Sequence, residues 1–265
     1  MVIHHAETVI RNTAMNRENR YAVAAALVIA CIAAVLLMMK VIGNPGNTAV
    51  IDSPEFRKDV LDKTIISDHS FDYIQVPEYS GDPYIEMNGN VPYFSRRQEA
   101  GRSYLSLSEM DALGRCGQAE AVICAAGLPS EKRGSIQNVR PSGWHTVRYD
   151  DVIEDRYLYN RCHLVAYELC GDNDERQLVT GTRYMNVSGM LPYENRVRDY
   201  VLSTGNHVQY RATPVFIDEE LVCRGILLEA YSVEDQGKGI QFCVFCFNVQ
   251  PGIRIDYLTG QSERE

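Results

Sequence analysis

The longest uninterrupted apolar stretch lies close to the beginning of the chain. Residues 21–39 are 19 consecutive positions without a charged side chain. A helix of about this length is needed to cross the hydrocarbon core of a membrane. Arginines precede the run and Lys40 alone follows it closely, and positively charged flanks tend to remain in the cytoplasm. The pattern therefore predicts a single-pass anchor in the cell membrane at residues 21–42, with a cytoplasmic N-terminus and the remaining chain outside.

Two other interpretations of this run stay open. A cleaved signal peptide usually has a shorter apolar core, of about 7–15 residues, with a small-residue cleavage site after it. Cys31 completes a V-I-A-C sequence typical of lipoprotein processing, but eight further apolar residues follow it. The length of the run favours an uncleaved anchor over both alternatives.

Alternating polar and apolar positions dominate the last part of the chain. Three such runs, at residues 207–217, 221–233 and 240–249, are separated by an acidic turn and a glycine-containing turn. Alternation of this kind is typical of strands with one buried face. We expect these runs to form an antiparallel meander.

Helical periodicity precedes the meander. Pro192 suits the first turn of a helix, Val197, Tyr200 and Val201 form an apolar face, and Gly205 provides a C-terminal stop. Further upstream, residues 144–164 contain two β-rich runs around an acidic turn, the second of which ends near a histidine. Residues 106–122 have a more helical pattern, and the pieces YIQVP and YIEMNG before them resemble short strands.

Glycine, proline and polar residues between the anchor and these elements are typical of a linker. The expected organisation is a cytoplasmic segment at residues 1–20, an anchor at 21–42, a stalk at 43–70 and one α+β domain at 71–265.

The charged side chains are distributed unevenly along the chain. The chain carries a formal net charge of −9, which argues against a protein that coats nucleic acid non-specifically. Residues 131–211, however, contain 11 basic and 11 acidic side chains. Arginines in this region, among them Arg133, Arg140, Arg161 and Arg183, are candidates for contacts with phosphate. A local basic cleft on an acidic body is compatible with the sequence.

Seven cysteines follow the apolar run. An odd number cannot pair completely within one chain, and the sequence does not assign their connectivity. Cys243 and Cys246 have the spacing of a metal knuckle, but they lie in a run that resembles a buried strand. Residues three apart on a strand point to opposite faces, so packing is favoured over a zinc site.

His163, Asn186 and Glu194 follow one another in an order that suits hydrolysis of a phosphodiester. Such a reaction needs a base that activates water and a cation that stabilises charge on the phosphate. Histidine titrates near neutral pH, and a cationic Arg161 beside it would help to keep it neutral. Asparagine offers a hard oxygen to Mg²⁺, and a glutamate can orient a metal-bound water. Singly, each residue is more often structural.

The segments NRCHL, GTRYMNVSGMLPYEN and TGNHVQYRATPVF together resemble the DNA/RNA non-specific endonucleases of the ββα-metal, or His-Me finger, fold. The subgroup that the chain resembles most is the bacterial DNA-entry nuclease type, and the likeness extends from about residue 84 to the segment NVQPGIRIDYLTG, which ends at residue 260. The family signature, Asp or Asn followed by Arg-Gly-His, stands here as Asn160-Arg161-Cys162-His163. Cys162 replaces the usual glycine.

This resemblance implies a ββα-metal domain with a central antiparallel sheet, acting on DNA and, as a second candidate, RNA. It assigns His163 as the general base, Asn186 as the ligand of Mg²⁺, for which Mn²⁺ is a candidate substitute, and Glu194 as the residue that holds a metal-bound water. Arg133 resembles the arginine that stabilises the pentacoordinate phosphate, and Arg161 contacts the substrate.

Three further residues are candidates for substrate binding: Arg140, Arg183 and Gln177. Gln177 stands nine residues before Asn186, where the family usually has another asparagine. Glutamine keeps the amide and adds a methylene group, so the role is expected to be preserved but shifted in position.

Two other functions compete with this assignment. A hydrolase with Cys162 as nucleophile needs His163 or His207 as its base, but adjacent residues on a strand diverge. A surface receptor that binds nucleic acid without cleaving it would need basic residues rather than the combination of His163, Asn186 and Glu194. No protein partner is inferable from the sequence.

Overall fold

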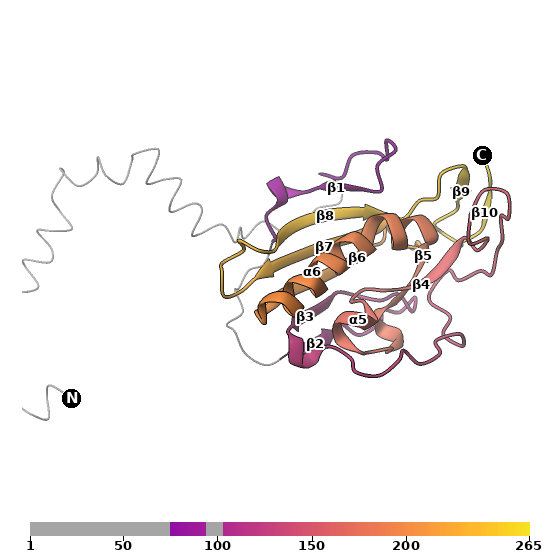
Figure 1. Cartoon of the computed structure of the whole chain (residues 1–265). Coiled ribbons are helices and arrows are strands. Elements are labelled where there is room, and N and C mark those ends of the chain that lie inside the picture. Colours follow the sequence, from indigo (N-terminus) through magenta and orange to yellow (C-terminus); the bar gives the residue numbers. More distant parts are fainter. Residues whose placement is uncertain (1–74, 94–102) are drawn as a thin grey trace, which may run out of the picture. The chain divides into compact units, whose positions relative to one another are not determined.

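The computed structural model describes residues 75–93 and 103–265 (Figure 1). Contacts between residues group Ile65–Glu265 into one compact unit. The predicted cytoplasmic segment, anchor and stalk, which together span residues 1–70, lie outside the described residues. Within the described ranges, no helix combines the length and the apolar character needed to cross a membrane.

A six-stranded antiparallel sheet carries the domain (Figure 1). In spatial order its strands are β1 (Tyr84–Glu86), β8 (Gln241–Phe247), β7 (Gly225–Ser232), β6 (Val208–Val215), β3 (Ala119–Ile123) and β2 (Tyr104–Leu107). The predicted central antiparallel sheet is therefore confirmed. Its three longest strands, β6, β7 and β8, are neighbours in chain order, which confirms the predicted meander.

The two faces of this sheet bury different side chains. Cys246 of β8 belongs to the larger core cluster, which also contains Val197 and Val201 of the helix above the sheet. Cys243, three residues earlier on the same strand, packs in a smaller cluster with Phe245. The two cysteines thus lie on opposite faces, as the strand pattern predicted.

A separate two-stranded sheet presents His163. Strand β4 (Tyr159–His163) pairs with β5 (Leu178–Thr182) so that His163 lies opposite Leu178. The expected position of His163 at the end of a strand is confirmed. The expected first strand, around residues 144–149, is wrong: that run contributes only an isolated bridge between Arg148 and Tyr157. Strand β5 is buried along its whole length, so it offers β4 the apolar partner that the polar upstream run lacks.

One continuous helical body follows β5. The π-helical segment η5 (Met185–Met190) leads directly into α6 (Leu191–Thr204). Pro192 lies in the first turn of α6, and Gly205 ends it with φ 73° while its N–H bonds to the carbonyl of Val201, so the predicted helix is confirmed. The π-turn was not predicted. It brings the backbone close to β8, where a Cβ on Gly189 would lie 3.2 Å from the Cβ of Cys246.

The helical pattern expected at residues 106–122 is wrong. This segment ends β2, turns, and enters β3. The carboxylate of Asp111 accepts backbone hydrogen bonds from Leu113 and Arg115, and Gly114 has φ 72°. A side chain that bonds the backbone locally competes with helix formation, so the turn replaces the helix. The strand-like piece YIEMNG contains β1, whereas the described residues 75–77 of YIQVP are not in a strand.

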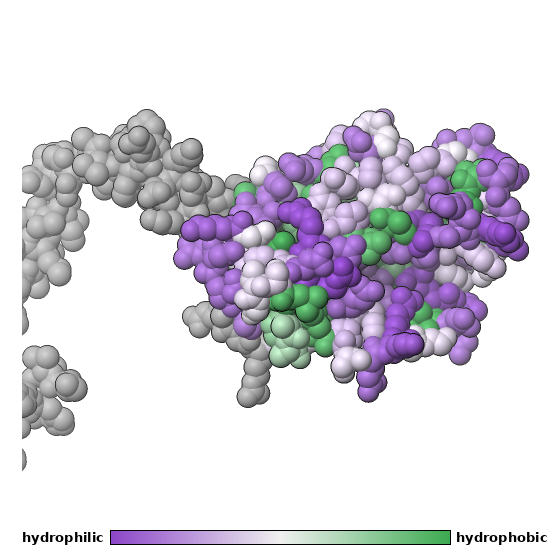
Figure 2. Space-filling view, in the orientation of Figure 1, coloured by the Kyte–Doolittle hydropathy of each residue, from purple (hydrophilic) through white to green (hydrophobic). Residues whose placement is uncertain are grey.

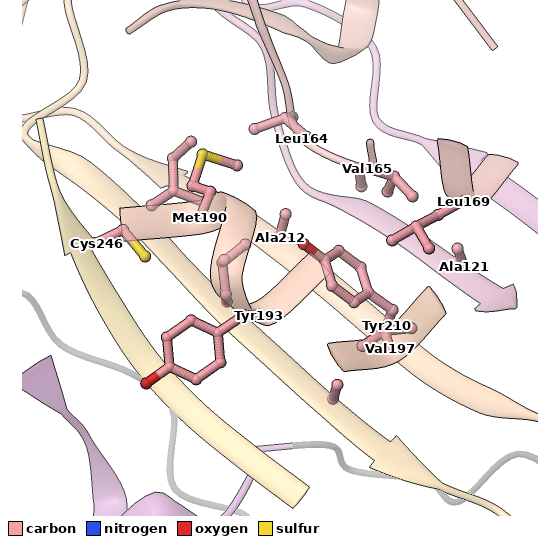
Figure 3. Close-up of a cluster of buried hydrophobic side chains, with 14 of the residues drawn as sticks. Ala121, Leu164, Val165, Leu169, Met190, Tyr193, Val197, Tyr210, Ala212 and Cys246 are labelled. Atoms are coloured by element: carbon pink, nitrogen blue, oxygen red, sulfur yellow. The ribbon is translucent and has the colours of Figure 1, made fainter. Parts of the chain in front are cut away.

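Helix α6 lies across the sheet, and the largest part of the core fills the space between them. In Figure 3, Tyr193 and Val197 extend from α6, and Tyr210 of β6 lies beside Val197. Tyr210 and Val197 are completely buried. The remaining short elements are η2 (Asn88–Asn90), η3 (Ala125–Gly127), α5 (Tyr167–Cys170), η4 (Glu175–Gln177), β9 (Ile253–Ile255) and β10 (Ser262–Arg264).

All seven cysteines within the described ranges carry free thiols. Six of them are buried and Cys170 is half-buried. Burial raises the pKa of the Cys162 thiol well above its ordinary value. A thiol is a poor nucleophile because the thiolate is the reactive form, so the geometry gives no support to a hydrolase that uses Cys162.

Candidate active site

A cleft of about 1130 Å³ opens between β4, α5, the beginning of α6 and the loop before β4. It contains five of the residues singled out from the sequence: His163, Asn186, Glu194, Arg133 and Arg161. Figure 2 shows that the face with α5 and α6 is mainly hydrophilic, with small separate apolar patches. The fold thus gathers into one cavity residues that are up to 61 positions apart in the sequence (194 minus 133).

His163 is held at the end of β4 with 7% of its surface exposed. Its Nε2 lies 3.0 Å from Oδ1 of Asn173. Burial is the main cause that lowers the pKa of His163, and the charge of Arg133 lowers it further. The hydrogen bond to Asn173 and the charge of Asp172 act in the opposite direction. A lowered pKa keeps the imidazole neutral at neutral pH, so it can accept a proton.

The cation that depresses the pKa of His163 is therefore Arg133. The sequence pointed instead to Arg161, its neighbour but one on β4. The guanidinium of Arg161 is held by the backbone: its Nε donates to the carbonyl of Val139 at 2.7 Å and its Nη2 to that of Gln137 at 2.8 Å. Its centre also lies 4.0 Å from the ring of Trp144, so stacking and hydrogen bonds fix its position.

Glu194, in the first turn of α6, is buried with 8% exposure. Burial raises the pKa of its carboxyl to about 8, and the nearby negative charge of Glu168 adds to this. A carboxyl in such surroundings favours its protonated form unless a cation approaches. Asn186, on η5, is half-buried and lines the same cleft. The π-turn places both residues on one helical body, a feature that recurs at functional sites.

Charged side chains of both signs surround these groups. Arg133 is exposed on the loop at the mouth of the cleft, with Lys132 beside it. Arg198 of α6 also lines the cleft and forms an ion pair with Glu168 at 2.9 Å. Within the described residues, no group of three or more His, Cys, Asp or Glu side chains is arranged to hold a metal ion.

Three predicted substrate-binding residues do not line the cleft. Gln177 is fully buried, so it has no surface through which to contact a substrate. Arg140 donates to the carbonyls of Gln137 and Val139. Arg183 forms an ion pair with Asp155. The contacts given for these three side chains are with other residues of the protein itself, and their predicted role in substrate binding stays a prediction.

Sequence reasoning did not single out Asn173 and Trp144. Trp144 is the only tryptophan of the chain, which was a usable signal for a special role. Asn173 had none, since an asparagine between two aspartates resembles a solvated turn. Its contact with His163 arises from the way the loop after α5 folds back on β4.

Comparison with known proteins shows which family this chain is similar to. A model of the DNA/RNA non-specific endonuclease family matches residues 95–234. A deoxyribonuclease of Streptococcus dysgalactiae subsp. equisimilis is 30% identical over 109 residues, which are 39% of this chain and 32% of that protein. The chain thus spans about a third of the length of this relative.

Two solved structures extend the similarity to the fold. NucA from Streptococcus agalactiae, with a magnesium ion bound, superposes with a TM-score of 0.64 and 25% identity, covering 82% of this chain and all of that one. The Sda1 nuclease with a bound zinc ion has a TM-score of 0.52 and 29% identity, covering 61% and 81%. The chain therefore belongs to the DNA/RNA non-specific endonuclease family, a family of phosphodiester hydrolases.

Proposed function

We propose that this protein is a metal-dependent endonuclease that cleaves DNA without sequence specificity, with His163 as its general base. One observation carries the proposal. His163, Asn186 and Glu194 line the same cleft as Arg133 and Arg161. A protein that only binds nucleic acid needs the arginines but does not need a buried histidine and a buried glutamate beside them.

His163 takes a proton from the attacking water in this proposal. Its lowered pKa keeps it neutral and ready to accept that proton. Arg133 is exposed beside it, so its charge can stabilise the phosphate as negative charge develops. The guanidinium of Arg161 is already oriented by Trp144 and by two carbonyl groups. Its Nη1 makes no hydrogen bond within the described residues and is available to a phosphate oxygen.

The donor atoms present fit a magnesium ion. Mg²⁺ takes hard oxygen ligands and keeps several waters, so Asn186 as a single protein ligand and Glu194 as the holder of a metal-bound water suffice. The raised pKa of Glu194 supports this, because no cationic partner of this buried carboxyl is found among the described residues and a carboxylate in such surroundings is suited to an incoming cation. When bound, the ion would supply positive charge to the phosphate. Mn²⁺, with similar ligand preferences, is the expected substitute.

The substrate class follows from the contacts available. The arginines at the cleft can bind phosphate groups, and contacts with phosphate carry no information about the base sequence. They carry no information about the sugar either, so RNA is the second substrate to test. DNA comes first because a relative that is similar in sequence is a deoxyribonuclease.

We further propose that residues 21–42 anchor the protein in the cell membrane with the nuclease domain outside. The support is the uncharged run of 19 residues and the arginines that precede it. Protease added to intact cells should remove the domain and leave the N-terminal segment protected. Release of the domain into the medium would favour the cleaved signal peptide instead.

The deciding experiment is plasmid degradation by the full chain with Mg²⁺ or with EDTA, beside His163→Ala. Removing the general base should lower the rate about 10²- to 10⁴-fold. His207→Ala is the matched control, since His207 bonds to Glu234 and does not line the cleft. Equal rates for the wild type and His163→Ala would refute the assignment.

Binding can be followed separately. Trp144 is the only tryptophan and lines the cleft, so its fluorescence reports occupancy. A fluorescence change with DNA but no cleavage in any divalent metal would favour the alternative, a catalytically impaired surface protein that binds or takes up nucleic acid.

A further inference from the structure

The loop between α5 and η4 is built to place one side chain. Gly171 ends α5 in the left-handed conformation with φ 68°, and the carboxylate of Asp174 caps η4 by accepting the N–H of Arg176. Between them, Oδ1 of Asp172 accepts the backbone N–H of Asp174 at 2.7 Å. These bonds leave Asn173 at the tip, where its Oδ1 meets Nε2 of His163 at 3.0 Å.

Gln177 fastens this loop from inside the protein. Its Nε2 donates to the same Oδ1 of Asp172 at 2.7 Å. Its backbone carbonyl accepts the N–H of Leu164 at 2.9 Å, so the residue is tied to β4 directly after His163. Gln177 thus bonds the carboxylate that closes the turn around Asn173, and Asn173 in turn contacts the imidazole.

Gln177 is also an unusual residue to bury. It has no exposed surface, and its Oε1 has no hydrogen-bond partner among the described residues. A buried acceptor without a partner is unfavourable, so packing alone does not account for a glutamine here. The amide N–H that reaches Asp172 gives it a reason to be present.

We infer that Asn173 and Gln177 are positioning residues for His163: Gln177 holds Asp172, and Asp172 holds Asn173 so that its amide oxygen fixes the imidazole in the tautomer protonated on Nε2. Nδ1 is then the nitrogen without a proton, which leaves it able to accept one. The inference rests on the proposed function only for the role of Nδ1 as the base. The tautomer itself is a property of the folded protein.

The opposite side of the Asn173 amide supports this orientation. Its Nδ2 lies 3.8 Å from the position that a Cβ on Gly134 would take, so the amide nitrogen is directed toward the loop that carries Arg133. The charged groups that act on His163 are Arg133 and Asp172. Asn173 therefore lies between the histidine and the segment that bears its cationic neighbour.

The direct test is ¹⁵N NMR of the full chain labelled at histidine, with His163 identified among six histidines by its loss in His163→Ala. Wild-type His163 should show the Nε2–H tautomer without added metal. Asn173→Ala should give a mixture of tautomers, and Asn173→Asp should restore the single form because it keeps the acceptor. An Nδ1–H tautomer in the wild type, or no change in Asn173→Ala, would overturn the inference.

Kinetics then separate positioning from folding. In Asn173→Ala, kcat should fall about 10-fold with KM nearly unchanged. The acidic limb of kcat/KM should move to lower pH, because the hydrogen bond to Asn173 raises the pKa of His163 and its loss therefore lowers that pKa. Asn173→Asp should move that limb to higher pH, since its charge stabilises the imidazolium.

Gln177→Leu should shift the tautomer in the same direction as Asn173→Ala, to a smaller extent. Asn206→Ala is the control, an amide that bonds to Tyr200 outside the cleft. If Gln177→Leu leaves the tautomer and the pH profile as in Asn206→Ala, Gln177 has no positioning role. If the wild type shows the expected tautomer but cleaves nothing, the proposed function fails while the positioning of His163 stands.

Discussion

Glu194 should make the metal-free protein less stable as the pH rises. Burial raises the pKa of this carboxyl from 4.5 to about 8, so the folded state binds the proton more tightly than the unfolded state. A raised pKa contributes stability that is fully present below the unfolded value and is lost as the pH rises through the folded value. The affected window extends from about pH 4.5 to about pH 8.

The magnitude follows from linkage. The pKa of Glu194 differs by about 3.5 between the unfolded and the folded state (8 minus 4.5), which corresponds to a loss of about 5 kcal/mol in the free energy of unfolding over the whole pH window. Between pH 5 and pH 8 the loss is roughly 3 to 4 kcal/mol, since part of the window lies below pH 5 and the group is only half ionised at pH 8. Other groups also titrate in this range, so only the difference from a variant isolates Glu194.

Glu194→Gln is the suitable perturbation, because glutamine has the shape of the protonated acid and cannot ionise. We expect urea unfolding in EDTA to show the variant gaining about 3 to 4 kcal/mol on the wild type between pH 5 and pH 8. Nuclease activity should be lost in the same variant. Adding Mg²⁺ at pH 8 should stabilise the wild type and leave the variant nearly unchanged, since a cation beside the carboxylate offsets its desolvation.

Glu219→Gln is the matched control, because Glu219 is exposed and its substitution alters the carboxylate count equally. It should leave the pH dependence of stability as it is in the wild type. Parallel stability curves for the wild type and Glu194→Gln from pH 5 to pH 8 would refute the reasoning, since they would mean that Glu194 titrates alike in the folded and unfolded states.

Two further predictions concern the scaffold. The completely buried carboxylate of Glu229 accepts hydrogen bonds from Arg211 at 2.6 and 2.9 Å, so Glu229→Gln should lower the free energy of unfolding by about 3 to 5 kcal/mol. Glu120 lies 3.6 Å from the same arginine and is more exposed, so Glu120→Gln should change the free energy of unfolding by less than about 1 kcal/mol. Equal effects of the two substitutions in urea titrations would contradict this. A Cβ on Gly260 would lie 1.9 Å from a backbone carbonyl oxygen, so Gly260→Ala should unfold at a lower temperature than Gly252→Ala, which has a similar positive φ but a contact of 3.5 Å. A smaller loss in Gly260→Ala would show that the C-terminal hairpin is not held where the structure puts it.

Local signals were sufficient for much of the scaffold. Alternating side chains in the last three long strands express the two-residue period of a half-buried strand, and the structure has the same strands in the same order. Pro192 and Gly205 mark the two ends of α6 because each imposes a backbone conformation on its own position. The same kind of local signal failed at residues 106–122, where a carboxylate bonds the backbone and makes a turn.

The sequence alone thus determined the candidate residues for the chemistry, the strand that ends at His163 and the helix whose first turn holds Glu194, because motif and periodicity depend on neighbouring positions in the chain. The tertiary structure decided the rest. Gln177 is fully buried, the guanidinium of Arg161 is held by a backbone carbonyl of the preceding loop and by the ring of Trp144, and Asn173 contacts His163. The pKa of Glu194 also depends on how completely water is excluded by neighbours from other elements. Desolvation and hydrogen-bond partners are set by contacts between residues far apart in the chain, so no local pattern specifies them.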